Sequence, residues 1–146
     1  MIYTIGYQNL AIDRFHRIAA ALDAIVVDIR LRPWSARPEF CRYPLKVALG
    51  DRYVHKGRSL GGMGQVTDEG IAWLRRQSGN VLLMCLETAP GDCHRHSDIC
   101  MPYFPQALHI FGNELVTAEE TERLIGSGSD AYAVHSRLSH LLRGKP

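Results

Sequence analysis

The sequence predicts an α/β domain built on an open, mostly parallel twisted sheet of about five strands with helices on both faces. Apolar β-rich runs alternate with amphipathic segments, and two of these runs, Ala24–Ile29 and Val81–Leu86, are apolar enough to be covered on both faces. The 146 residues suit a single domain, and 46% hydrophobic with 22% charged residues is the balance of a globular protein. We expect a core over residues 1–112 and a C-terminal helical extension over residues 113–146.

The first part of the chain reads as a β-α-β unit. Ile2–Gly6 is a short β-rich run, and Leu10–Leu22 has apolar residues at the spacing of one helix face. Asn9 precedes this helix as a candidate N-cap. Ala24–Ile29 follows as a strand, so the unit should be parallel and right-handed.

The next elements are shorter. Arg30–Leu49 contains three prolines, and we expect a long ordered loop with one turn of helix near Leu45–Leu49. Arg52–His55 is expected to form a short strand. The glycine-rich segment Lys56–Gln65 should be a loop. Its spacing matches neither a Walker A loop nor a dinucleotide-binding fingerprint.

A helix and the best-defined strand come next. Thr67 is a candidate N-cap for a helix that runs to about Gln77. Val81–Leu86 is the strand that the sequence predicts most clearly. Beyond a turn at Pro90–Asp92, we expect a short helix, Cys93–Met101, that Pro102 ends.

The remaining chain is expected to hold one strand and two helices. Ala107–Phe111 should be the last strand, and Thr117–Ile125 a helix that begins with a capping box. The glycine and serine residues of Gly126–Ser129 predict a joint before a basic amphipathic helix, Ala131–Leu142.

Polar sequence follows four of the predicted strands. Because the carboxyl ends of parallel strands meet at one edge of a sheet, these segments should converge there and form a ligand site. The segments are Gly6–Asn9, Asp28–Arg30, His55–Arg58 and Glu87–Pro90.

The Asp28–Arg30 segment and the loop after it are open to two interpretations. Asp28 and Arg30 lie two residues apart and so share one face of a strand. They can form a structural pair, or Asp28 can handle protons while Arg30 binds an anion. The loop to Arg42 includes Arg37 and interleaves arginines with aromatic residues. That composition fits a phosphate or nucleic-acid surface, and equally a lid of packed aromatics with solvated arginines.

The segment Cys85–Arg95 is the most informative in the chain. A buried strand delivers Cys85 and Glu87 on one face, and a turn leads to a helix that begins near Cys93. Four interpretations stay open: anion binding with Glu87 as general acid or base, a reactive thiol at Cys85 or Cys93, a zinc site, and a purely structural role. The zinc interpretation would use some of Cys85, Cys93, His94 and His96.

Several of these motifs, taken in order, resemble the family catalogued as domain of unknown function 488, and the resemblance covers residues from Thr4 to Phe111. The resemblance implies an α/β domain with a shared polar site, and it supplies no activity. Tyr7 stands where members usually have histidine. The motifs are Thr4–Tyr7, Asp28–Arg30 with Pro33 and Arg37–Phe40, Tyr53–His55 with Leu60–Gly62, and Cys85–Glu87 with Pro90 and Cys93–Arg95.

The gross properties restrict the function. The net charge of +2 gives no global field that would favour nucleic acid or an anionic membrane, and the longest apolar runs are too short to span a bilayer. The first residues lack the pattern of a secretion signal, so we expect a cytoplasmic protein with reduced thiols and no membrane partner.

We therefore expect an enzyme that hydrolyses or transfers a group on a phosphate-bearing substrate, first of all a nucleotide or a nucleic acid, without a cofactor or metal. The alternatives are a non-catalytic nucleic-acid-binding module and a thiol-dependent enzyme. The expected catalytic residues are Glu87, Asp28 and Cys93, and the expected anion-binding residues are Arg30, Arg37, His55, His94 and Arg95. Asp28, Arg30, Glu87, Cys93 and Arg95 should share one pocket.

Overall fold

A computed structural model describes residues 1–126 and has an α/β fold with one six-stranded, mostly parallel sheet. The expected terminal helix Ala131–Leu142, and the joint beyond Gly126, lie outside the described residues. The strands are β1 (Ile2–Gly6), β2 (Ala24–Asp28), β3 (Tyr53–His55), β4 (Asn80–Cys85), β5 (Leu108–Phe111) and β6 (Glu114–Thr117). They are ordered β3-β2-β4-β1-β5-β6, and all neighbours are parallel except β5 and β6.

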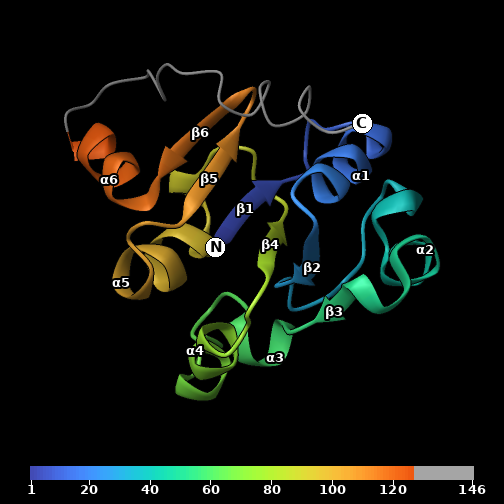
Figure 1. Ribbon diagram of the computed structural model, residues 1–146, viewed down its shortest axis with the longest axis horizontal. Coiled ribbons are helices and arrows are strands. Elements are labelled where there is room, and N and C mark those ends of the chain that lie inside the picture. Colours follow the sequence, from blue (N-terminus) through green and yellow to red (C-terminus); the bar gives the residue numbers. More distant parts are fainter. Residues whose placement is uncertain (127–146) are drawn as a thin grey trace.

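Helices cover both faces of this sheet. They are α1 (Ile12–Ala21), α2 (Arg42–Leu49), α3 (Gly57–Leu60), α4 (Asp68–Arg75), α5 (Met101–Tyr103) and α6 (Ala118–Gly126), with a π-helix at Arg95–Cys100 and 3₁₀ turns at Pro38–Phe40, Gly50–Arg52 and Pro90–Asp92. Figure 1 shows α1 and α2 together on the right, and α3 with α4 below. No helix among residues 1–126 combines the length and the apolar character needed to cross a bilayer.

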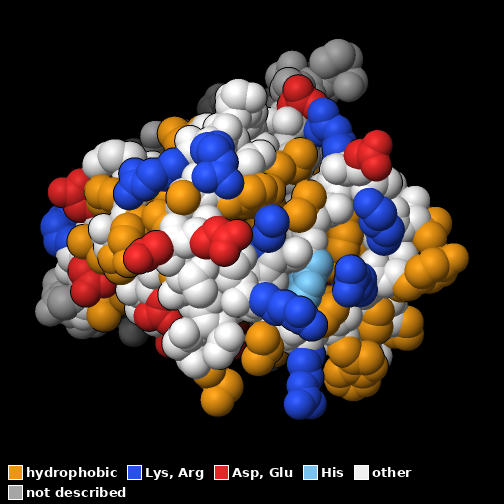
Figure 2. All heavy atoms as spheres, turned by 90° about the horizontal axis from the view of Figure 1, so that it is seen from below, with side chains coloured by type: hydrophobic (Ala, Val, Ile, Leu, Met, Phe, Trp, Pro, Cys, Tyr) orange, Lys and Arg blue, Asp and Glu red, His pale blue; other side chains and the backbone are white. Residues whose placement is uncertain are grey.

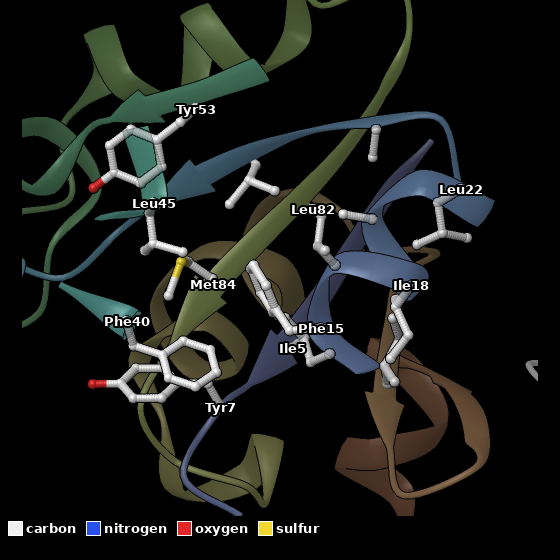
Figure 3. Packing of buried hydrophobic residues seen from close by; sticks show 14 of the residues in the cluster. Ile5, Tyr7, Phe15, Ile18, Leu22, Phe40, Leu45, Tyr53, Leu82 and Met84 are labelled. Carbon is white, nitrogen blue, oxygen red and sulfur yellow. The ribbon is translucent and has the colours of Figure 1, made fainter. Parts of the chain in front are cut away.

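The side chains of the central strands β2 and β4 alternate between two hydrophobic cores. In β4, Leu82 and Met84 face the core formed with α1 and α2, whereas Leu83 and Cys85 face the core formed with α4 and the π-helix. Figure 3 shows the first core, where Tyr7 stacks on Phe40 with ring centroids 4.5 Å apart. This alternation decides which polar side chains can meet at the edge of the sheet.

Two helix starts differ from the sequence prediction. Ala11, and not Asn9, is the N-cap of α1, and no side chain caps this helix. Helix α2 begins at Arg42, earlier than expected, because Pro44 lies in its first turn, where the missing N–H of proline removes no helical hydrogen bond. The long loop after β2 is therefore shorter than the prolines suggested.

The second half of the chain differs at two places. The segment expected as one regular helix, Cys93–Met101, is mainly the π-helix, and Pro102 lies inside α5 and does not end the helical segment. Strand β6 pairs antiparallel with β5 across a turn that contains Gly112 (φ 62°), so the extension expected to be helical begins with a strand.

Two predicted caps are confirmed. Gly70 N donates to Thr67 Oγ1 (3.1 Å) at the start of α4, and Glu120 N donates to Thr117 Oγ1 (3.0 Å) at the start of α6.

Candidate functional site

The candidate site lies at the carboxyl edge of the sheet, where β4 ends at Cys85. The loop after β4 crosses the end of β1, where Tyr7 N donates to Cys85 O (3.0 Å). A Cβ atom on Gly6 would lie 1.6 Å from Glu87 O, so this crossing requires glycine. The chain then turns and returns to the same edge at Cys93.

Three potential ligand atoms converge at this point. The sulfurs of Cys85 and Cys93 and the Nδ1 atom of His94 all lie within 4.8 Å of one another. Nδ1 is 3.9 Å from Cys85 Sγ and 3.7 Å from Cys93 Sγ. We call Cys85, Cys93 and His94 the thiol cluster. Both cysteines are buried, and His94 is half-buried.

The ring of His94 is held from its far side. Its Nε2 atom lies 3.0 Å from the carbonyl oxygen of Leu60, the last residue of α3. A carbonyl oxygen can only accept, so Nε2 carries the hydrogen and Nδ1 faces the sulfurs. Gly62 lies against the ring, since a Cβ atom there would be 3.4 Å from Nδ1. The glycine-rich segment after α3 thus leaves room for the ring.

Glu87 lies beside the thiol cluster. The Cys85 thiol donates to Glu87 Oε2 at 3.4 Å. Glu87 is half-buried, and it follows Cys85 by two residues. A carboxylate in this position can accept the proton of the Cys85 thiol.

The pKa values of the two thiols are shifted in opposite directions. The Cys85 thiol is the main cause that lowers the pKa of Cys93; burial opposes this shift, and His94 and Arg95 add to it. The Cys93 thiolate in turn raises the pKa of Cys85, together with burial and Glu87. Burial disfavours the charged form of His94, but the neighbouring Cys93 thiolate outweighs it and raises the pKa of the imidazole. In the metal-free protein Cys93 is therefore the thiolate of the pair.

The donors of Arg95 are engaged within the protein, so its expected anion-binding role is not supported. Its side chain is fully buried and lies on the sheet side of the loop. Its Nε donates to Thr4 Oγ1 (3.0 Å), its Nη1 to Glu87 O (2.8 Å) and its Nη2 to Thr88 O (3.2 Å). Arg95 therefore holds the loop that carries Glu87, and its donors do not face a ligand.

Asp28 and Arg30 form the structural pair that was one of their two interpretations. Arg30 Nε and Nη2 donate to the two carboxylate oxygens of Asp28 at 2.9 and 2.8 Å, and Nη1 donates to Tyr7 Oη at 3.2 Å. Tyr53 Oη also donates to Asp28. Asp28 has no exposed surface, and burial together with Asp28 raises the pKa of Tyr53. The expected proton transfer by Asp28 and anion binding by Arg30 do not fit this network.

Arg37 and His55 are also engaged within the protein. Arg37 Nη1 donates to Tyr7 O at 3.0 Å, and its guanidinium lies 4.5 Å from the centre of the Phe40 ring. His55 Nε2 lies 2.7 Å from Arg30 O. Both side chains fix loops at the edge of the sheet, so their expected anion-binding role is not supported.

The expected single pocket is wrong, because its members lie on opposite faces of the sheet. Asp28 pairs in register with Met84, one residue before Cys85, so the Asp28 and Cys85 side chains point to opposite faces. Asp28 and Arg30 lie with Tyr7 and Tyr53 on the α1 face. Of the expected site residues, the structure brings together Glu87, Cys93 and His94.

A buried histidine pair was missed from the sequence. Thr4 Oγ1 lies 2.7 Å from His109 Nδ1, and His109 Nε2 lies 3.0 Å from His96 Nδ1. His96 Nε2 reaches Glu122 Oε2 at 2.7 Å. Burial, with Arg95 and His96, lowers the pKa of His109 to about 3, so this imidazole is neutral. The pairing of β1 with β5 creates the contact, which no local motif reveals, and His96 is thereby turned away from the thiol cluster.

A cleft opens at the same edge, between the ends of β1 and β5. It has a volume of about 430 Å³, and Thr88, the residue after Glu87, lies in its wall. The polar residues that line it are Asn9, Arg14, Thr88 and Asn113. Asn9 Nδ2 donates to Thr88 Oγ1 (3.2 Å), which links the first and fourth strand-end loops.

Comparisons with protein-family models, curated proteins and solved structures found no match to this chain. Two thiols of opposite acidity, an oriented imidazole and a carboxylate are suited to nucleophilic thiol chemistry and to the binding of a soft metal ion.

Proposed function

We propose that this protein is a thiol-dependent enzyme that exchanges two electrons with a disulfide substrate through Cys93 and Cys85. The observation that carries the proposal is the convergence of both sulfurs and His94 Nδ1 within 4.8 Å. A lone thiol would support only nucleophilic attack. A second thiol at this distance can resolve the intermediate that the first one forms.

In the first step the Cys93 thiolate attacks one sulfur of the substrate disulfide. The substrate S–S bond breaks, a mixed disulfide with Cys93 forms, and the first substrate thiolate leaves. His94, whose Nδ1 atom is 3.7 Å from Cys93 Sγ, stabilises the attacking thiolate and can give a proton to the leaving one. The Arg95 backbone N–H, 3.5 Å from the same sulfur, also favours the thiolate.

In the second step Cys85 resolves the mixed disulfide. Its thiol passes its proton to Glu87, 3.4 Å away, and the new thiolate attacks Cys93 Sγ. A Cys85–Cys93 disulfide forms, and the second substrate thiol is released. The enzyme has then lost two electrons, which two equivalents of an external thiol restore as they are oxidised to their disulfide. Closure to an S–S bond of about 2.05 Å requires the two sulfurs to approach.

The test is reaction of the fully reduced, chelator-treated protein with a small aromatic disulfide that releases a coloured thiolate. We expect a fast release of two equivalents and a Cys85–Cys93 disulfide in peptide mapping. Cys85→Ser should release one fast equivalent and retain a mixed disulfide on Cys93, and Cys93→Ser should lose the fast phase. Cys100→Ser is the matched control, since Cys100 is buried outside the thiol cluster. A fast phase that survives in Cys93→Ser would overturn the proposal.

A second candidate is binding of a phosphate-bearing ligand on the surface around α3 and α4. Figure 2 shows this face, where Lys and Arg side chains lie near one another. Lys56 Nζ lies 4.5 Å from the centre of the Trp73 ring, and Arg58 and Arg76 are exposed. Cations beside an aromatic ring suit phosphates and stacked bases. Binding of a labelled single-stranded oligonucleotide should weaken steeply with salt and in Arg58→Ala, and binding that neither change alters would contradict this candidate.

A further inference from the structure

The thiol cluster has the donor atoms of a metal site. Two cysteine sulfurs and one histidine nitrogen are typical ligands of zinc and of other soft divalent cations. Among residues 1–126 this is one group in which three such ligand atoms lie within 4.8 Å of one another. Cys85 is at the end of β4, and Cys93 and His94 come directly before the π-helix, so two separate parts of the fold supply the ligands.

The distances fit a tetrahedral ion. With Zn–S bonds of about 2.3 Å and Zn–N bonds of about 2.0–2.1 Å, tetrahedral angles place the ligand atoms about 3.5–3.8 Å apart. Nδ1 of His94 is 3.7 Å from Cys93 Sγ and 3.9 Å from Cys85 Sγ. The two sulfurs lie within 4.8 Å of each other and would have to come to about 3.8 Å.

The orientation of His94 is that of a metal ligand. Metal-binding histidines usually donate their second ring N–H to a carboxylate or to a backbone carbonyl, which fixes the tautomer and the direction of the ring. Here Nε2 donates to Leu60 O at 3.0 Å, and Nδ1 faces both sulfurs. The carbonyl belongs to α3, so a separate element of the fold holds the ring in place.

We propose that the reduced protein binds one zinc-like ion through Cys85 Sγ, Cys93 Sγ and His94 Nδ1. The fourth position falls to water or to the carboxylate of Glu87, which contacts Cys85 at 3.4 Å. This inference rests on ligand geometry alone and goes beyond the exchange reaction proposed above.

Metal binding and disulfide formation exclude each other at these residues. Both thiolates are ligands in the metal-bound state, so a metal–sulfur bond must break before either one attacks. When a disulfide R–S–S–R oxidises the bound pair, a Cys85–Cys93 bond forms and the substrate bond breaks. Two R–S⁻ ions and the metal ion leave. The metal ion therefore protects the reduced thiols, and oxidation of the thiols releases the metal ion.

Cobalt is the probe for the test, because a thiolate–Co²⁺ site absorbs in the near ultraviolet and a tetrahedral one also in the visible. Co²⁺ added to the reduced, metal-free protein should bind one ion per chain and be displaced by Zn²⁺. Cys85→Ser, Cys93→Ser and His94→Ala should each lose at least about 100-fold in affinity, since even an outer partner of a ligand is worth 10–100-fold. Cys100→Ser should bind as the wild type does.

A second measurement uses the wild-type chain and does not depend on folding of the variants. Zn²⁺ should protect Cys85 and Cys93 from alkylation, as mapped by mass spectrometry, and should leave Cys41 unchanged. Absence of a saturable 1:1 complex, or equal losses in Cys85→Ser and Cys100→Ser, would overturn the metal site. If the protein reacts with the disulfide in the presence of chelator but binds no Co²⁺ or Zn²⁺, the metal site is wrong and the proposed exchange reaction stands. Metal binding without exchange would remove the proposed function only.

Discussion

The two polar clusters at the carboxyl edge differ in how far their hydrogen-bonding capacity is satisfied. On the α1 face, both oxygens of Asp28 accept from Arg30, and Tyr53 Oη is a further donor. On the other face, the hydrogen-bond partners of His94 Nδ1 among residues 1–126 are the two sulfurs, at 3.7 and 3.9 Å. Buried charges that satisfy one another are costly to separate and leave no donor or acceptor for a ligand. Soft ligand atoms that face one another without a strong donor keep the capacity to bind a ligand or to form a bond. Both clusters lie at strand ends, so this position alone does not distinguish a structural network from a candidate site.

The largest expected effect concerns the hydrogen-bonded cluster of Asp28, Arg30 and Tyr53. Asp28→Ala should lower the free energy of unfolding by about 3–5 kcal/mol, because it leaves Arg30 as a buried cation without its partner. Urea denaturation measures this loss. Glu39→Ala is the matched control: Glu39 also pairs with an arginine, Arg37, but 39% of its side chain is exposed, and the expected change is below about 1 kcal/mol. Equal losses in the two variants would show that the Asp28 cluster is not a structural network.

An intermediate effect concerns the acidity of the thiol cluster. Because its pKa is lowered, Cys93 should remain a thiolate at pH values where an ordinary thiol is protonated. In metal-free protein its alkylation rate should stay nearly constant from pH 8 to pH 6, whereas a free thiol of pKa about 8.5 slows by about tenfold per pH unit below that value. His94→Ala should restore part of the pH dependence, since the imidazole helps to lower the pKa of Cys93. A wild-type rate that falls tenfold per unit would contradict the thiolate assignment.

The fold was predictable from the sequence where apolar runs are long. β1, β2 and β4 are close to their expected bounds because each is a continuous β-rich run between polar segments. The expected chain of β and α elements also gives the parallel sheet. β6 was missed because Glu114–Thr117 is short and half polar, and it is a strand only through its pairing with β5.

The edge that carries the site was also predictable, but its face was not. Asp28 pairs with Met84, and Gly6 pairs with Cys85. This offset of one residue separates the two clusters, and strand register depends on long-range pairing that one sequence does not reveal. For the same reason Arg95 resembled an anion ligand, since nothing local indicates that Thr4 and two loop carbonyls take up its donors.

The smallest expected effect tests whether the space that Gly62 leaves for the His94 ring affects metal binding by the thiol cluster. Gly62→Ala would place a Cβ atom 3.4 Å from His94 Nδ1, at the short limit of ordinary contact, so the ring would be displaced by a few tenths of an ångström at most. Because Nδ1 is the atom that faces the sulfurs, Co²⁺ affinity should fall several-fold, while unfolding free energy changes by less than about 1 kcal/mol. Gly79→Ala is the matched control, since a Cβ atom there meets nothing within 4 Å, and it should leave Co²⁺ affinity unchanged. If Gly62→Ala binds Co²⁺ as the wild type does, Gly62 does not set the position of the ring, and the fixed orientation of His94 does not contribute to metal affinity.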